Sequence, residues 1–218
     1  LPTEESGPTL DEFRDPMFWK GLYEHVQGQV RRIGEMMHLF GMAGPRREPQ
    51  FSDELSLATL LCATTEQLGP RLQSRKIEIE TSVPNDLPTL HVDLVTSNHL
   101  FDFLLEDELS HLPEGSRIWI HAGNSKTPDT AGQEIQIELA DNGPGLPETS
   151  LRSVFDPFVV RQSANLDYGL NLMAAYLVVY HHSGHVEVLD RDGGGTVFRI
   201  TLPVRPTPNP ATTREQEF

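Results

Sequence analysis

The turn Asp141-Asn142-Gly143-Pro144-Gly145 constrains the fold of this chain more than any other segment, because it directly follows an alternating apolar run at residues 135–139. A carboxylate at the end of a strand can accept a hydrogen bond from the exocyclic amine of a flat ring. Two glycines in the turn allow the backbone to approach such a ring closely. The same residues also fit an ordinary turn. The segment therefore predicts a strand that ends either in a ring-binding site at Asp141 or in a hairpin turn without a ligand.

Composition and charge exclude several classes of partner. The 218 residues include 17 Lys and Arg against 32 Asp and Glu, which gives a formal net charge of -15 at pH 7. Nucleic acids and anionic membranes require a cationic surface, so we expect no nucleic acid as a partner and no direct membrane contact. Cys62 is the only cysteine, which excludes an internal disulfide and favours a cytoplasmic location. We expect neither a transmembrane segment nor a signal peptide in this sequence. The same pattern is expected if the sequence is the cytosolic part of a membrane-bound protein.

The chain is expected to divide into a helical segment and a globular domain, flanked by disordered ends. Residues 1–15 are polar and contain two prolines, and they are predicted to form a disordered lead. A helix is expected over 16–44, because Pro16 suits a helix start and a stretch with glycine and proline supplies the stop. The domain is expected over 50–204, and residues 205–218 are predicted to form a disordered tail.

The helix expected at residues 16–44 carries an apolar stripe that needs a cover. Its apolar positions are separated by steps of 4, 4, 3, 4 and 3 residues, which is close to a heptad seam: Leu22, Val26, Val30, Ile33, Met37 and Phe40. No second long helix lies near it in the sequence. We therefore expect a homodimer through residues 16–40, and the alternative is a helix that packs back onto its own domain.

Residues 50–204 show alternating helical and strand patterns. Several strands alternate between apolar and polar residues, so one face of the sheet is expected to be solvated. The pattern predicts an α/β protein with a two-layer α/β sandwich, in which helices cover one face of a mixed sheet. Helices are expected at about 52–72, 93–111 and 169–182, and strands at 77–81, 117–121, 134–140, 185–189 and 196–202.

Four further motifs flank the turn at Asp141 in a fixed order. Upstream lies Phe103-Leu104-Leu105-Glu106-Asp107-Glu108-Leu109-Ser110-His111, followed by Pro113-Glu114-Gly115. Downstream lie Phe155-Asp156-Pro157-Phe158, then Tyr168-Gly169-Leu170-Asn171-Leu172, then Gly193-Gly194-Gly195-Thr196. The order and spacing of the five motifs resemble the ATP-binding domain of sensor histidine kinases, of the Bergerat or GHKL class, with degenerate N and G2 boxes. The resemblance covers residues 50–204, and residues 16–44 resemble part of the dimerisation region.

The resemblance implies a site for ATP and Mg²⁺ at these motifs. Asp141 matches the aspartate that binds the adenine amino group. Asp107 stands where the family usually has the asparagine that ligates Mg²⁺; a carboxylate can hold this cation, but it adds negative charge beside a triphosphate. The alternative for Asp107 is a solvated helix acid. The implied nucleotide-binding set is Asp107, His111, Asp141, Gly143, Gly145, Arg161, Gly169, Leu170 and Thr196.

Two of the motifs depart from the family pattern. The lid motif, usually G-x-G-L-G-L, reads Asp167-Tyr168-Gly169-Leu170-Asn171-Leu172, so one of three glycines remains. Asp167 can cap the helix start and occupy donors that a phosphate needs, which predicts weakened nucleotide binding. Arg161 is a candidate contact for the γ-phosphate, or else an exposed surface arginine. Phe103 stands where many hydrolysing relatives have a water-activating glutamate, so simple ATP hydrolysis is disfavoured.

Several histidines have structural alternatives. His111 lies four residues after Asp107, hence on the same helix face, at a position that borders the phosphates in the family. A structural role for His111 is equally compatible with the sequence. A zinc site is conceivable at three clustered histidines, but the Ser183-Gly184 turn among them favours an ordinary helix end: His181, His182 and His185.

The expected activity is that of the catalytic domain of a protein histidine kinase, which moves the γ-phosphoryl group of ATP onto a histidine on a segment absent here. Residues 11–17 echo the acceptor motif H-E-L-R-T-P-L, but Asp11 stands where the histidine belongs. The implied partner is the receiver domain of a response regulator. A second interpretation is a degenerate domain that binds nucleotide weakly or not at all and acts as a dimeric docking or phosphotransfer scaffold. A serine kinase acting on an anti-sigma partner is a third.

Overall fold

A computed structural model describes residues 16–43, 50–125, 133–146, 155 and 170–207. The chain divides into two compact units, Leu1–His38 and Leu39–Phe218. The predicted disordered lead at 1–15 lies outside the described residues. Of the predicted tail, residues 205–207 are described, and the main-chain oxygen of Thr207 accepts a hydrogen bond from Ser183 Oγ at 2.5 Å.

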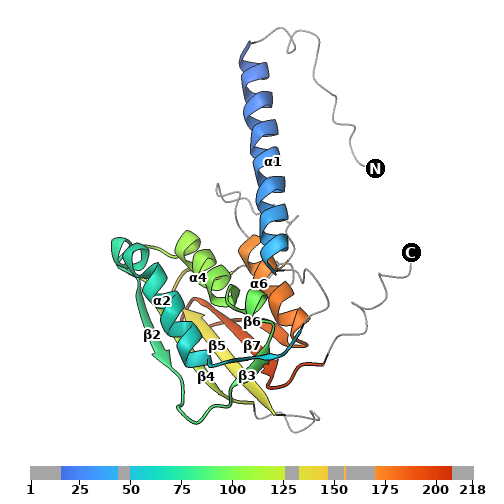
Figure 1. Cartoon of the computed structure of the whole chain (residues 1–218). Helices are drawn as coiled ribbons and strands as arrows, with labels where there is room; N and C mark the ends of the chain where they lie inside the picture. The colour runs from blue at the N-terminus through green and yellow to red at the C-terminus, as the bar shows by residue number, and fades with distance from the viewer. Residues whose placement is uncertain (1–15, 44–49, 126–132, 147–154, 156–169, 208–218) are drawn as a thin grey trace, which may run out of the picture. The chain divides into compact units, whose positions relative to one another are not determined.

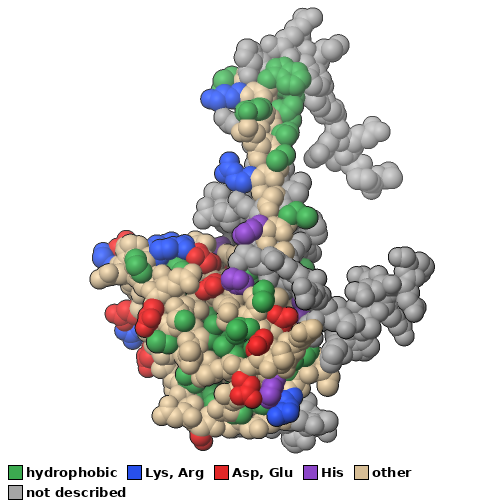
Figure 2. Space-filling view, in the orientation of Figure 1, with side chains coloured by type: hydrophobic (Ala, Val, Ile, Leu, Met, Phe, Trp, Pro, Cys, Tyr) green, Lys and Arg blue, Asp and Glu red, His purple; other side chains and the backbone are tan. Residues whose placement is uncertain are grey.

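Helix α1 (Pro16–Ala43) provides the described part of the first unit. Figure 2 shows hydrophobic side chains along this helix. Four side chains of the predicted seam are described and all are exposed: Leu22, Val26, Val30 and Met37. Among the helices of the described residues, none is long and apolar enough to cross a membrane.

The second unit is built on a five-stranded mixed sheet. The strand order is β2-β4-β5-β7-β6, with β2 parallel to β4 and all other neighbours antiparallel. Strands β1 (Asp53–Leu55) and β3 (Leu90–Val92) form a separate two-stranded antiparallel sheet. The strands of the main sheet are β2 (Glu78–Ser82), β4 (Arg117–Asn124), β5 (Glu134–Asp141), β6 (His185–Asp190) and β7 (Thr196–Pro203).

Helices cover one face of this sheet (Figure 1). They are α2 (Leu57–Ser74), the short α3 (Leu94–Ser97), α4 (Leu100–His111) and α6 (Leu170–His181). Asp93 begins α3, where its carboxylate accepts hydrogen bonds from the main-chain N–H groups of Val95 and Thr96. Such a cap satisfies helix donors that have no partner within the helix.

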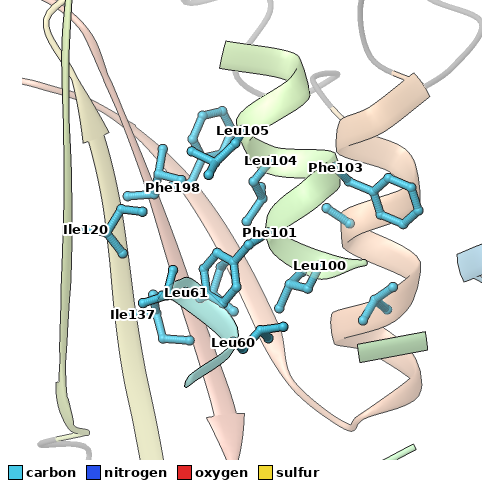
Figure 3. Packing of buried hydrophobic residues seen from close by; sticks show 14 of the residues in the cluster. Leu60, Leu61, Leu100, Phe101, Phe103, Leu104, Leu105, Ile120, Ile137 and Phe198 are labelled. Carbon is cyan, nitrogen blue, oxygen red and sulfur yellow. The ribbon is translucent and has the colours of Figure 1, made fainter. Parts of the chain in front are cut away.

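Strand alternation places the apolar side chains under the helices. On β5, Ile135, Ile137 and Leu139 are fully buried, whereas Gln136 and Glu138 between them are only half-buried. The predicted two-layer α/β sandwich with one solvated sheet face is therefore confirmed. Figure 3 shows the core, in which side chains of α2 and α4 meet the sheet: Leu60, Leu61, Leu100, Phe101, Leu104, Leu105, Ile120, Ile137 and Phe198.

The segment after α2 holds the C-terminal end of α4. The Arg75 guanidinium donates hydrogen bonds to the main-chain oxygens of Leu109 and Leu112. A cation is stabilising there because the last carbonyl groups of a helix have no partner within the helix and carry partial negative charge. Arg75 therefore fixes the end of α4 from which the acidic residues of the candidate site project.

His182, directly after α6, is a buried structural residue. It is 3% exposed, its Nε2 accepts a hydrogen bond from the Asp93 N–H at 3.1 Å, and its Nδ1 lies 2.7 Å from Val178 O. Because Nε2 is an acceptor, the neutral ring carries its proton on Nδ1 and donates to Val178. Burial lowers the pKa of His182 below its ordinary value. In the part of the chain that the structure describes, no group of three or more His, Cys, Asp or Glu lies close enough together to hold a metal ion.

We predict that His182→Phe destabilises the domain most at high pH. At pH 8 the neutral imidazole makes buried hydrogen bonds, and their loss should cost about 1–3 kcal/mol of unfolding free energy. Because the folded-state pKa of His182 is lowered, the unfolded wild type binds the proton more readily once the pH falls below the ordinary value of 6.5. The advantage of the wild type should therefore shrink towards pH 5.5.

Urea unfolding of both proteins at pH 8 and pH 5.5 measures this change. His185→Phe, which makes the same substitution at an exposed histidine, is the matched control. A stability gap between wild type and His182→Phe that stays constant over this pH range would contradict the assignment.

Candidate functional site

Asp141 ends strand β5 with its carboxylate held by backbone donors. Its Oδ1 accepts from the Gly143 N–H at 2.6 Å, and its Oδ2 accepts from the Thr196 N–H at 2.8 Å. Asp141 is only 3% exposed. Burial raises the pKa of Asp141 above its ordinary value, and the two N–H donors and the Arg191 guanidinium oppose this shift. The carboxylate therefore has a fixed orientation, with lone pairs left for a further donor.

Three glycines allow the backbone to close around this carboxylate. A Cβ on Gly143 would lie 2.6 Å from Leu112 Cδ2 and 2.8 Å from Asp141 Oδ1. Gly195 has a φ of 101°, and a Cβ there would lie 2.1 Å from the main-chain oxygen of Asp141. Gly145 has a φ of 74°, and a Cβ there would lie 3.2 Å from Gly195 O. Side chains at these positions would push the two loops apart.

A cleft of about 300 Å³ lies beside Asp141, between α4, the turn after β5, α6 and β7. The structure brings five residues of the predicted set together as its lining: Asp107, His111, Asp141, Gly145 and Thr196.

The four remaining predicted residues do not line the cleft or are not described. Gly143 joins the site through its hydrogen bond to Asp141. Leu170 is buried in the first turn of α6 and is not among the residues that line the cleft. Arg161 and Gly169 lie outside the described residues.

Asp107 and His111 form a pair on one face of α4. His111 Nδ1 lies 3.3 Å from Asp107 Oδ2 and 2.6 Å from the main-chain oxygen of Asp107. Asp107 is 4% exposed, so the alternative of a solvated helix acid is wrong for this residue. Its Oδ1 is buried and has no hydrogen-bond partner among the described residues. An unsatisfied carboxylate oxygen in a cleft fits a hard divalent cation such as Mg²⁺, which takes one or two carboxylates and completes its shell with phosphate oxygens and water.

Glu108 is a cleft residue that the sequence analysis misses. It is 5% exposed and lines the cleft beside Asp107. Burial, and then the negative charges of Asp141 and Asp107, raise the pKa of Glu108 well above its ordinary value. Helical spacing is the signal that could have found it: Glu108 lies four residues after Leu104 and four before Leu112, which are both buried, and it shares their inward face.

Phe103 does not line the cleft. It is 3% exposed and points towards α6 in the core (Figure 3). Its ring lies 5.9 Å from that of His99. The residue at this helix position therefore contributes to packing and offers no group that could accept a proton from water.

The arrangement suits a ligand with a polar flat ring and a polyanionic group. Asp141 presents a fixed acceptor to an amino group. Asp107 presents a buried carboxylate oxygen in the same cleft, which requires a cation before a polyanion can approach. Leu146, Leu172 and Phe198 add apolar surface to the lining on which a ring can pack.

We predict that Glu108→Gln stabilises the domain at neutral pH. The raised pKa means that the folded state holds a proton on Glu108 more tightly than the unfolded state does. Ionisation of the wild-type residue therefore costs stability as the pH rises above the ordinary value of 4.5, whereas glutamine, of similar shape, carries no charge. Each kcal/mol of ionisation cost that the substitution removes should raise the Tm of Glu108→Gln above that of the wild type by about 2–4 °C at pH 8. Near pH 4.5 the two Tm values should differ little.

Thermal unfolding with a chelator present measures the effect of Glu108→Gln without interference from metal ions. Glu80→Gln, at an exposed side chain on β2, is the matched control. A Tm for Glu108→Gln at pH 8 that equals or falls below that of the wild type would contradict the prediction.

Comparisons with known proteins identify relatives of this chain. The family described as "Histidine kinase-, DNA gyrase B-, and HSP90-like ATPase" matches residues 95–206. The chain is 30% identical over 188 residues to the adaptive-response sensory kinase SasA of Synechococcus sp. (strain JA-3-3Ab), which covers 84% of this chain and 48% of that relative. The chain thus spans about half the length of this curated relative.

Solved structures share the fold. The catalytic domain of histidine kinase ThkA superimposes with a TM-score of 0.59 at 20% identity, covering 71% of this chain and 98% of that one. ThkA in complex with the response regulator protein TrrA gives a TM-score of 0.62 at 18% identity, covering 88% and 53%. The five-stranded sheet and its helices therefore match the α/β sandwich of histidine kinase catalytic domains.

Proposed function

Because the chain belongs to the family of histidine kinase-, DNA gyrase B- and HSP90-like ATPases, we propose that it binds ATP with Mg²⁺ in the cleft beside Asp141 and transfers the γ-phosphoryl group to a histidine. The relatives that it matches are sensor kinases, and its domain is the ATP-binding catalytic domain of that type. The acceptor histidine would come from a segment outside this chain.

The orientation of the Asp141 carboxylate carries this proposal. Backbone N–H groups of Gly143 and Thr196 fix both oxygens, and their remaining lone pairs can accept from the exocyclic amino group of adenine. Guanine presents a carbonyl oxygen at the equivalent ring position, which an ionised carboxylate would repel. Gly145 lines the cleft beside it and keeps the turn compact. The geometry thus supports selection of adenine.

The end of α4 supports a role in holding the phosphates. Asp107 Oδ1 would be the protein ligand of Mg²⁺, which when bound would neutralise negative charge on the phosphate oxygens. His111 lies beside Asp107 and orients its second oxygen. Transfer to an imidazole needs positioning and charge stabilisation: the acceptor nitrogen forms a bond to the γ-phosphorus while the bond to ADP breaks. The packing of Phe103 away from the cleft leaves no base at that position and disfavours hydrolysis by water.

The scaffold interpretation is not favoured. It rests on the lid substitutions, of which Asn171 is half-buried at the start of α6, whereas Asp167 lies outside the described residues. The carboxylate that recognises the base is held in place, and the relatives that match the chain are kinases.

The partners and location follow from the same proposal. The receiver domain of a response regulator would accept the phosphoryl group downstream, and ThkA, a structural neighbour, has been crystallised with such a regulator. Exposed apolar side chains along α1 support a homodimer through residues 16–40: Leu22, Val26, Val30 and Met37. We place the chain in the cytoplasm, where ATP is supplied, with no direct contact to membrane or nucleic acid.

We predict that Asp141→Asn weakens ATP binding about 10- to 100-fold, the size expected for a hydrogen bond to a charged group. The NH₂ group of the new asparagine cannot accept a hydrogen bond, so it would face another donor, which is either a backbone N–H or the adenine amino group. Calorimetric titration with ATP and Mg²⁺ measures the effect, with Asp190→Asn at an exposed strand end as control. An affinity of Asp141→Asn equal to that of the wild type would show that the base lies elsewhere.

The transfer step is measured with γ-labelled ATP and a separate helical hairpin that carries an acceptor histidine. We expect acid-labile label on the hairpin with the wild type and much less with Asp141→Asn. Nucleotide binding without transfer, or no binding heat with the fold intact, would favour the scaffold instead.

We predict that Asp107→Asn reduces the dependence of ATP binding on Mg²⁺. Without the cation, the Asp107 carboxylate repels the triphosphate, so the variant should bind metal-free ATP more tightly than the wild type does. With Mg²⁺ present, the variant should gain less affinity because a neutral amide is a weaker ligand for the cation. Titrations with Mg²⁺ and with a chelator measure both effects.

Glu106→Gln is the matched control for Asp107→Asn, because Glu106 pairs with Arg71 on the outer side of α4 and does not line the cleft. If Mg²⁺ increases the affinity of wild type and Asp107→Asn by the same factor, Asp107 is not the metal ligand.

A further inference from the structure

The loop between β6 and β7 is a compact hairpin turn. The Arg191 N–H donates to Gly195 O at 3.1 Å, and the Gly194 N–H donates to Arg191 O at 3.0 Å. Three consecutive glycines with φ between 91° and 103° complete the turn: Gly193, Gly194 and Gly195. These bonds tie the position of Arg191 to the position of the residue before Thr196.

This hairpin contacts Asp141 at three points. The Thr196 N–H donates to Asp141 Oδ2 at 2.8 Å. Gly195 packs so closely against the main-chain oxygen of Asp141 that a Cβ would lie 2.1 Å from it. Arg191 Nη1 lies 3.4 Å from the same main-chain oxygen and donates to it. The hairpin thus determines where both the main chain and the carboxylate of Asp141 lie.

Arg191 is itself held by an aromatic ring on the open face of the sheet. Its guanidinium carbon lies 4.2 Å from the centroid of the Trp119 ring, within the range of a cation–π interaction. Trp119 belongs to β4 and pairs in register with Ala140, the residue before Asp141. Arg117 approaches the same ring at 6.0 Å, but its side chain is paired with Glu78. The indole therefore anchors the hairpin to the strand beside Asp141.

We propose that Arg191, stacked on Trp119, is a positioning residue for base recognition: it anchors the β6–β7 hairpin so that Thr196 and the main chain hold the Asp141 carboxylate towards the cleft. The proposal rests on the function proposed above, in which Asp141 binds adenine. Trp119 acts from the sheet face opposite the helices, and neither Trp119 nor Arg191 lines the cleft.

Charge adds to this geometric role. The Arg191 guanidinium lowers the pKa of Asp141 and so opposes the effect of burial. Other groups that face the Asp141 carboxylate are the N–H donors of Gly143 and Thr196, the Thr196 hydroxyl, and the carboxyl group of Glu108 on α4, beside Asp107. Removal of the Arg191 charge should therefore raise the pKa of Asp141, and the loss of ATP binding in acid should begin at a higher pH.

The test compares Arg191→Met, Arg191→Lys, Trp119→Leu and Trp119→Phe by titration with ATP and Mg²⁺ from pH 6 to pH 8.5. We expect Arg191→Met and Trp119→Leu each to weaken ATP binding about tenfold, from loss of a partly buried cation–π contact and its anchoring. Arg191→Lys and Trp119→Phe keep the charge and a ring, so they should retain most of the affinity. Because both substitutions remove the same contact, the double variant Arg191→Met/Trp119→Leu should bind ATP at most about twofold more weakly than either single variant.

Two controls separate positioning from general destabilisation. Binding of tripolyphosphate with Mg²⁺, which lacks the base, should stay at the wild-type level in Arg191→Met. Arg117→Met removes the other cation near Trp119 and should leave ATP affinity unchanged. Equal loss of ATP and tripolyphosphate binding, or wild-type ATP affinity in Arg191→Met, would overturn the proposal.

Measurements without nucleotide test the positioning role of Arg191 separately from the proposed binding of ATP. NMR titration of the Asp141 carboxyl carbon and hydrogen exchange of the Thr196 amide report the anchoring directly. We expect Arg191→Met to raise the apparent pKa of Asp141 and to speed exchange at Thr196. If the wild type binds no ATP, the proposed function fails; unchanged titration and exchange in Arg191→Met would overturn the positioning role as well.

Discussion

The burial of the Asp141 carboxylate is the constraint on which the site depends. A buried charge is tolerated only where hydrogen bonds replace the water it has lost. Here the two donors come from different segments, one in the turn after β5 and one at the first residue of β7. β5 and β7 must therefore be neighbours, as the strand order makes them. Gly143 and Gly195 then allow the two segments to meet without a clash. The orientation of the Asp141 carboxylate thus requires both the order of the strands and glycine at positions 143 and 195.

The lining of the cleft is acidic, and this bears on which ligands can enter. Asp107, Glu108 and Asp141 are all buried along its wall. The pKa of Glu108 is raised because ionisation there would add a third negative charge in a poorly solvated place. A polyanion alone would meet repulsion from Asp107, whereas a polyanion with a divalent cation would not. The same acidity favours an amino group over a carbonyl oxygen at Asp141. In the proposed function, charge therefore acts on the base through Asp141 and on the phosphates through Asp107.

Residues with a turn or strand-end signature could be predicted from the sequence, whereas residues that act through tertiary contacts could not. Asp141, Gly143 and Gly145 are close together in the chain, so the strand end and its turn are local features; their nucleotide-binding role is predicted only from the resemblance of the five motifs. Glu108 is different, because an acidic run on a helix usually faces water. Only its helical spacing from the buried residues Leu104 and Leu112 indicates that Glu108 faces inward. Arg191 and Trp119 are 72 residues apart in the sequence and meet only because β4 and the β6–β7 hairpin flank β5. No periodicity in either segment contains that information.

The residues that we propose bind the base and the motif that we expect to contact the phosphates belong to different parts of the chain. Asp141 is fixed by β5, the following turn and the β6–β7 hairpin, whereas the lid motif with Asp167 and Asn171 precedes and begins α6. The hydrogen bonds of Asp141 come from Gly143 and Thr196 and from no residue of the lid motif. In the proposed function, lid substitutions would therefore lower phosphate affinity without changing base selectivity. This separation explains in physical terms how a chain can depart from its family at two lid positions, Asp167 and Asn171, and still carry the hydrogen-bonded carboxylate that we propose recognises the base.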